Sequence, residues 1–245
     1  MKKDRKERIA VVAGVRSPFI KAGGDLSKSS ADNLGTHVLK ELLKEEWIDK
    51  SKIDEVIIGN VAQPAHAANI ARVIALNAGL NKEIPDFNVH RYCASGMESV
   101  SSAAYKLRCN DAKLIIAGGT ESMSNIPFLF TPELKYILES LSKAKTIKQK
   151  LKIIKHIKLK YLKPIIGLIQ GLTDPTCNMI MGITAENIVR EFKITREEQD
   201  RYSLESHQKA IKGEANRKEE ICPIPTLPNY SKILTKDDGP RKEQT

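Results

Sequence analysis

The sequence lacks any apolar run long enough to cross a bilayer as a helix. It also lacks the apolar region and the small-residue cleavage site of a secretion signal, and Asp4 and Glu7 in its charged start argue against a transit peptide. Aromatic residues make up only 5% of the chain and are not interleaved with the basic ones, which argues against a nucleic-acid-binding surface. We therefore expect a bacterial-type cytoplasmic protein without a signal peptide or transmembrane segment.

Paired cysteines are also missing. None of the four cysteines forms a C-x-x-C pair, which argues against a zinc site and against a disulfide scaffold. We expect no bound metal, and each cysteine has to be judged by its neighbours. The four are Cys93, Cys109, Cys177 and Cys222.

The net charge of +10 comes from one segment. Nine lysines and no acid lie between Ser142 and Pro164, so subtracting nine from ten leaves the remainder at +1. The basic character is therefore local and does not predict a nucleic-acid partner. The lysines are residues 143, 145, 148, 150, 152, 155, 158, 160 and 163.

Strand and helix patterns alternate through the first 120 residues. Short apolar runs predict strands at 9–14, 54–59, 86–90 and 113–118, and 3.6-residue periodicity predicts helices at 30–47, 67–78 and 94–107. Such alternation indicates an α/β fold with a parallel or mixed sheet covered by helices on both faces.

After residue 120 the pattern becomes mostly helical. Helices are predicted at 132–142, 143–162, 184–192 and 195–212, with a short strand at 222–224. Thr195-x-x-Glu198 fits a capping box at the start of the last helix. We predict an α/β core over 1–120, followed by a second region over 121–245 that contains the basic insertion 142–164.

Cys93 is the first candidate for chemistry because it lies between a short strand and a helix. The helix begins with Ala94, Ser95 and Gly96, whose small side chains allow close approach of a ligand. Unpaired backbone N–H groups and the positive end of the helix dipole lower a thiol's pKa, and a thiolate is the nucleophile that forms a thioester. The alternative is a buried structural thiol next to small packing residues.

Five segments, in order along the chain, resemble the thiolase family. VHRYCASGMES resembles the thiolase nucleophile segment, and IIAGGTESMSNIP resembles the family's AGGTE-S-MS stretch. The other three are VRSPF (15–19), QPAHAANIARVIALNAGL (63–80) and the long stretch 171–210. The resemblance implies a thiolase-like fold in which a mostly helical loop domain is inserted into the N-terminal half.

The resemblance also implies roles for three residues. Cys93 matches the acyl-accepting nucleophile, whose backbone N–H helps to hold a thioester oxyanion. Met181 matches a methionine that lines the coenzyme A pocket, with plain core packing as the alternative. Arg241 matches an arginine near the coenzyme A nucleotide, with a solvated tail residue as the alternative. Ile180 stands where short-chain biosynthetic thiolases often have histidine. Coenzyme A is implied as a substrate, and no other cofactor.

Thiolases also use a histidine in a Gly-His-Pro-like motif, a second cysteine in a glycine-rich motif and an asparagine, all from their C-terminal half. This sequence has neither of the first two motifs, and His207 is interpreted as structural or exposed. We therefore expect the C-terminal half to be absent. The leading hypothesis is a 3-ketoacyl-CoA thiolase acting on acyl-CoA and CoA. Alternatives are an inactive fragment, a split-gene or partner subunit, and an acetoacetyl-CoA-forming biosynthetic thiolase. The resemblance suggests a dimer or higher oligomer.

The basic segment 142–164 has its own alternatives. Its isoleucines and leucines fall roughly on one helical face, and a basic amphipathic helix can lie on an anionic membrane or dock on a partner. A solvated helix covering a tunnel is the other interpretation. The segment resembles the insertion in the β-subunit of the mitochondrial trifunctional protein, which favours a degradative enzyme with a β-oxidation partner subunit.

Overall fold

The computed structural model describes residues 8–244 and divides into two compact units. The first comprises residues 1–125 together with 200–245, and the second comprises 126–199. The sequence predicted a division at residue 120 with everything beyond it in one region. Residues 200–245 instead form a unit with the α/β core, because polar contacts from their last part reach the N-terminal segment.

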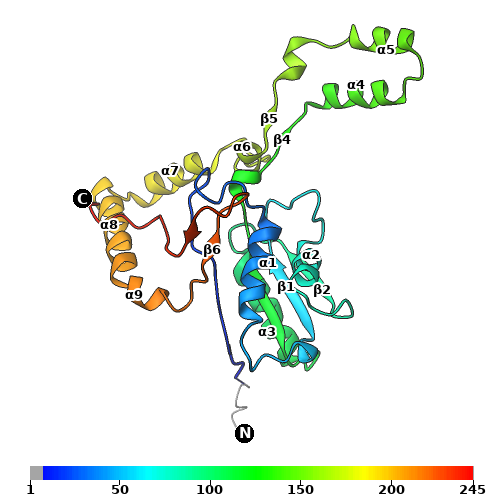
Figure 1. Ribbon diagram of the computed structural model, residues 1–245. Helices are drawn as coiled ribbons and strands as arrows, with labels where there is room; N and C mark the ends of the chain where they lie inside the picture. Colours follow the sequence, from blue (N-terminus) through cyan, green and yellow to red (C-terminus); the bar gives the residue numbers. More distant parts are fainter. Residues whose placement is uncertain (1–7, 245) are drawn as a thin grey trace, which may run out of the picture. The chain divides into compact units, whose positions relative to one another are not determined.

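The first unit is built on a three-stranded parallel sheet. Its strands are β1 (Glu55–Gly59), β2 (Asp86–Val89) and β3 (Ile115–Gly119), arranged in the order β2-β1-β3 (Figure 1). Val56 pairs with Asp86 on one side and with Ile116 on the other. The predicted α/β class and three of the four predicted strands are confirmed.

One face of this sheet carries the main apolar core. Helices α1 (Ala31–Leu42) and α2 (Ile70–Asn77) pack there, and Val56 and Ile58 of β1 point into the same cluster. Ile70 and Ile74 are completely buried. Because β1 alternates between faces, every second side chain of this strand belongs to this core.

The opposite face is covered by α3 (Ser95–Arg108). Ile57, fully buried, lies on the β1 face opposite Val56 and Ile58. At the far end of the helix, Lys106 Nζ lies 2.8 Å from a carboxylate oxygen of Glu55. The side chains that α3 buries are small, namely Ser95, Ser99 and Ala103.

The predicted strand at 9–14 is wrong. Residues 8–15 form no strand, and Val11 is 86% exposed. Arg16 makes an isolated bridge to Ile221, so the chain is paired only where this segment ends. An apolar run becomes a strand only where it pairs with another strand. Residues 9–14 pair with none of the described strands, although the outer edge of β3 has no partner among them.

Polar contacts tie the end of the chain to its beginning within the first unit. The Arg16 guanidinium donates to both carboxylate oxygens of Asp237, at 2.8 and 2.9 Å, and to Glu220 at 2.9 Å. Asp237 also accepts from the backbone N–H of Phe19 at 2.8 Å. The elements of this returning part are α8 (Arg196–Lys212), α9 (Glu214–Arg217), β6 (Ile224–Pro225) and β7 (Ile233–Leu234).

The second unit is mostly helical. Strands β4 (Phe128–Leu129) and β5 (Ile165–Ile166) pair antiparallel and enclose α4 (Pro132–Lys143), α5 (Ile147–Ile154) and a 3-10 helix, η3 (Leu159–Leu162). Helices α6 (Gly167–Gly171) and α7 (Met181–Phe192) follow. The single helix predicted over 143–162 is wrong, because a turn at 144–146 and a break after Ile154 divide it. None of the helices described in residues 8–244 is long and apolar enough to cross a membrane.

Candidate active site

The loop between β2 and α3 carries Cys93 in a tight turn. Tyr92 has a left-handed backbone with φ of 48°. The Ala94 N–H donates to the Arg91 carbonyl at 3.1 Å, and the Ser95 N–H donates to the Tyr92 carbonyl at 3.0 Å. These bonds turn the chain sharply from the strand into the helix, so Cys93 sits at the turn's outer side as an exposed residue.

Two buried serines fix this turn to the sheet. The Ser95 hydroxyl accepts from the Arg91 N–H at 2.8 Å and donates to the Tyr92 carbonyl at 2.6 Å. The Ser99 hydroxyl lies 2.7 Å from the Gly96 carbonyl and 2.8 Å from the Gly118 carbonyl of β3. A buried hydroxyl that meets backbone carbonyls holds the helix start at one distance from the sheet. No specific signal in the sequence pointed to this role of the two serines.

Glycines let the start of α3 approach the strand ends backbone to backbone. A Cβ added to Gly59 would lie 2.3 Å from the carbonyl carbon of Ser95, and one on Gly119 would lie 3.1 Å from the Gly96 Cα. Only glycine tolerates such an approach at Gly59. The glycines that end β1 and β3 therefore position the helix that follows Cys93.

Cys93 lies just before the N-terminus of α3, which no side chain caps. Ala94, the N-cap residue, offers no side-chain acceptor. Within the described part of the chain, the backbone N–H groups of Gly96 and Met97 have no acceptor either. Unpaired N–H groups at a helix start bind developing negative charge, such as a thiolate or an oxyanion. The predicted placement, a solvent-accessible thiol at a helix start, agrees with this geometry.

Hydrogen bonds join the loops after β1 and β3 at the same edge of the sheet, where the carboxyl ends of the parallel strands meet. Glu121, after β3, accepts from the backbone N–H groups of Val61 and Ala62 at 2.9 and 3.1 Å. The Asn60 side-chain amide donates to the Thr120 carbonyl at 2.8 Å. The AGGTE motif thus fixes the loop after β1, and ligands of parallel sheets bind beside such edges.

No other cysteine or histidine of the described residues makes a hydrogen bond to Cys93. Cys109 lies at the other end of α3, about 20 Å away along a helix of this length. Cys222 is buried, and burial raises the pKa of its thiol. The His90 ring packs edge-on against Tyr92 at 5.2 Å.

The other two predicted site residues lie elsewhere. Met181 is the first residue of α7 in the second unit and is half-exposed. Arg241 belongs to the first unit, where its backbone N–H donates to His207 Nδ1 at 3.1 Å and its guanidinium reaches Gln244 at 3.4 Å. No hydrogen bond or ion pair of the described residues joins Arg241 to Cys93. His207 acts as an anchor for the last segment, in keeping with its predicted structural role.

The described residues contain no cluster of three or more histidine, cysteine, aspartate or glutamate side chains that could hold a metal ion.

The chain matches one family model over nearly its whole length. That model, the thiolase N-terminal domain, matches residues 9–245. Among curated proteins, the chain is 33% identical over 235 residues to a 3-ketoacyl-CoA thiolase of Shigella dysenteriae, covering 95% of this chain and 53% of the relative. It is 32% identical over 240 residues to a probable acetyl-CoA acyltransferase of Staphylococcus aureus, covering 96% and 56%.

Solved structures give the same relationship. The acetyl-CoA acetyltransferase of Bacillus anthracis superposes with a TM-score of 0.79 at 31% identity, covering 95% of this chain and 55% of that one. A thiolase from Ascaris suum in complex with coenzyme A gives a TM-score of 0.74 at 28% identity, with coverage of 92% and 53%. The chain spans about half the length of the relatives it matches.

Proposed function

We propose that this chain, which belongs to the thiolase N-terminal domain family, carries the acyl-accepting cysteine of an acyl-CoA C-acyltransferase. The observation that supports this proposal most directly is the exposed Cys93 at the uncapped start of α3. We propose the 3-ketoacyl-CoA thiolase type used in fatty-acid β-oxidation. Curated relatives named for that activity, and Ile180 in place of a histidine, favour it over a biosynthetic enzyme.

In the proposed reaction the Cys93 thiolate attacks the 3-keto carbon of a 3-ketoacyl-CoA. A bond forms between Sγ and that carbon, the bond to the neighbouring CH₂ breaks, and the departing carbon takes a proton to give acetyl-CoA. A CoA thiolate then attacks the acyl-enzyme and frees Cys93. The N–H groups at the start of α3 would stabilise the negative charge that develops near the sulfur.

Of the groups that this reaction needs, the chain's own residues supply only the nucleophile and the N–H groups beside it. The proton for the departing carbon and the base that activates CoA would have to come from groups outside these 245 residues, because no described cysteine or histidine is hydrogen-bonded to Cys93. We propose that such groups belong to a polypeptide equivalent to the other half of the relatives. A split enzyme and a partner subunit share this requirement, whereas an inactive fragment would never meet it.

We assign coenzyme A contacts to Met181 and Arg241. Arg241 lines an open surface hollow of about 330 Å³, and a guanidinium suits a phosphate. Met181, half-exposed at the start of α7, offers an apolar surface to a thioester arm. Both assignments derive from the family resemblance and are supported by exposure alone.

Acyl transfer to Cys93 tests the proposal. The chain is incubated with acetyl-CoA, and each cysteine is then examined for a thioester by peptide mass spectrometry. We expect an acetyl adduct on Cys93 that disappears in Cys93→Ser. Cys109→Ser is the matched control, since Cys109 is also exposed and lies at the opposite end of the same helix.

Labelling of Cys93 must exceed that of Cys109 and Cys177 by at least about tenfold if the helix start activates it. Equal labelling of all exposed cysteines would mean chance thiol exchange. The absence of any Cys93 adduct, also when a polypeptide equivalent to the other half is supplied, would favour the inert fragment.

A further inference from the structure

An ion pair spans the turn that carries Cys93. The Arg91 guanidinium donates to the Glu98 carboxylate, and these two residues flank Cys93 in the sequence. The Glu98 N–H donates to the Ala94 carbonyl at 2.8 Å, so Glu98 lies one helical turn beyond Ala94. Side chains of a helix lean towards its N-terminus, and the Glu98 carboxylate does so to reach Arg91. Both charges therefore lie close to the turn that carries Cys93.

The main chain of Arg91 belongs to the same turn. Its carbonyl accepts from the Ala94 N–H at 3.1 Å, and its N–H donates to the Ser95 hydroxyl at 2.8 Å. One end of the Arg91 side chain is therefore fixed within the turn, and the bond to Glu98 fixes the other end. The same bond raises the pKa of Arg91, so the guanidinium stays charged.

Within the stretch that contains Cys93, this pair supplies the fixed charges. Over residues 87–105, Arg91 is the only lysine or arginine and Glu98 is the only acid. The carboxylate of Glu121 lies at the same edge of the sheet, where it accepts from two backbone N–H groups of the loop after β1. The remaining titratable side chains of the stretch are His90, Tyr92 and Tyr105.

We propose that Arg91 and Glu98 together set the reactivity of the Cys93 thiol, with Arg91 cancelling the charge of Glu98. A carboxylate in the first turn stabilises a helix through the helix dipole. The same carboxylate disfavours a thiolate beside it, because the two negative charges repel. Arg91 removes that repulsion, so α3 keeps its acid next to a nucleophile. This inference rests on the proposed role of Cys93, and Arg91 acts in it through Glu98 without touching the substrate.

Alkylation of Cys93 measures this effect without any acyl transfer. The whole 245-residue chain and its variants are treated with iodoacetamide near neutral pH and at low salt, and Cys93 labelling is followed by peptide mass spectrometry. Arg91→Gln should slow labelling by about threefold, because Glu98 is left uncompensated. Glu98→Gln should speed labelling by about threefold, because Arg91 then faces the thiolate alone. The two variants break the same bond, yet they should shift the rate in opposite directions.

Two further variants and added salt separate charge from shape. Arg91→Gln combined with Glu98→Gln removes both charges and should label at nearly the rate of the unchanged chain. Arg91→Lys keeps the positive charge and should label within about twofold of the unchanged chain. High salt should shrink the effects of both single Gln variants, because it screens charges near the surface.

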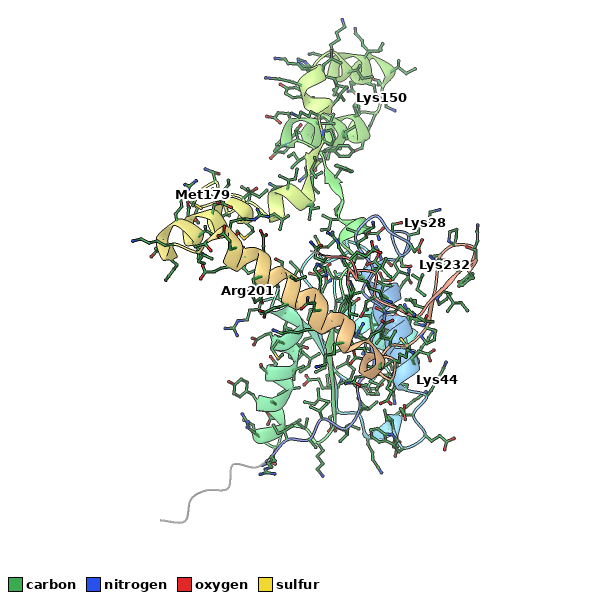
Figure 2. The ribbon with its side chains drawn as sticks, turned by 90° about the vertical axis from the view of Figure 1, so that its left-hand side faces the viewer. Lys28, Lys44, Lys150, Met179, Arg201 and Lys232 are labelled. Atoms are coloured by element: carbon green, nitrogen blue, oxygen red, sulfur yellow. The ribbon has the colours of Figure 1, made fainter. Side chains whose placement is uncertain are left out.

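The matched control uses an ion pair of the same unit on the other face of the sheet. Lys44 pairs with Glu41 at the end of α1, and Figure 2 labels Lys44 beside that helix. Lys44→Gln and Glu41→Gln change the net charge by the same steps as the two test variants. Both controls should leave the labelling of Cys93 unchanged.

A shift in the same direction in Arg91→Gln and Glu98→Gln would overturn the proposal, because the pair would then act only by holding the turn in shape. Unchanged rates in both variants, or equal shifts in the controls, would overturn it as well. Failure of the proposed function gives a different result. The order of labelling rates would then stand, but no variant would form an acetyl adduct on Cys93 with acetyl-CoA.

Discussion

The two helical layers that cover the three-stranded sheet differ in what they bury. The α1–α2 layer places large aliphatic side chains such as Ile70 and Ile74 completely inside the core. The α3 layer buries only small residues and leaves Met97 at 68% and Tyr105 at 65% exposed on its other side. The α1–α2 layer is fully packed within this chain. Helix α3 instead carries apolar side chains on both of its sides, as helices do that are covered on both sides.

Exposed apolar surface costs about 25 cal/mol per Å², so several hundred Å² on α3 and on residues 9–15 cost several kcal/mol. That is comparable with the whole stability of a domain, about 5–15 kcal/mol.

The largest expected effect concerns the solubility of the whole chain, which depends on the exposed apolar side of α3. We expect the 245-residue chain to aggregate when it is expressed alone, because α3 exposes apolar side chains. Met97→Lys with Tyr105→Lys should raise the soluble fraction several-fold, as measured by centrifugation and size-exclusion chromatography. The matched control, Lys113→Arg, changes no apolar surface. A sharp, cooperative, monomeric melt of the unchanged chain would contradict the comparison.

The next prediction contrasts one residue from each layer. Ile74→Ala should cost about 2–5 kcal/mol of unfolding free energy, because it opens a cavity in a filled core. Met97→Ala should change that free energy by less than about 0.5 kcal/mol. Urea denaturation followed by far-UV circular dichroism measures both. Similar costs at the two positions would mean that α3 is as well packed as α2.

Gly59→Ala probes the close contact between the layers at the site. Its new Cβ would meet the Ser95 backbone, so we expect a loss of about 1–3 kcal/mol and slower labelling of Cys93. Gly118→Ala has open space around its Cβ and should be tolerated. Denaturation and thiol-labelling rates check both variants. If Cys93 is labelled at the same rate in Gly59→Ala, the close contact at Gly59 does not determine where Cys93 lies.

The smallest effect concerns the polar contacts of the N-terminal segment. The Arg16 guanidinium lowers the pKa of Asp237 below its ordinary value of about 4. This pair therefore stabilises the fold above about pH 4, and its contribution disappears as the pH falls through the lowered pKa. Asp237→Asn should cost about 1–2 kcal/mol at neutral pH and nothing in strong acid.

Asp25→Asn is the matched control for this pH dependence, because its ion pair with Lys232 is exposed. It should change stability by less than about 0.5 kcal/mol at any pH. Thermal melts recorded from acid to neutral pH give both values. If Asp237→Asn lowers stability by the same amount at every pH, Asp237 stabilises the fold through packing and not through its charge.

Patterns along the sequence predicted the parts that depend on neighbours close in the chain. The strands at 55–59, 86–89 and 115–119 and the helix after Cys93 follow from apolar periodicity and turn residues. The Thr195–Glu198 capping box is confirmed, with Thr195 N–H donating to the Glu198 carboxylate at 2.8 Å and Glu198 N–H donating to Thr195 Oγ1 at 3.2 Å. Such signals are local, so they need no tertiary partner.

The failed predictions depended on partners that a local pattern does not contain. Residues 9–14 have the composition of a buried strand, yet they pair with none of the described strands. The lysine-rich run 143–162 has the periodicity of one helix, but the chain turns at 144–146, so that α5 lies against α4, and α5 ends at Ile154. The roles of Ser99 and Gly59 became visible only when α3 was placed on the sheet.

The sequence by itself determined the α/β pattern, the family and the placement of a cysteine at a helix start, because each depends on residues adjacent in the chain. Only the tertiary structure decided which faces of the helices are packed and which remain exposed to solvent. Burial depends on what packs against a surface, and no described residue covers the side of α3 that carries Met97 and Tyr105.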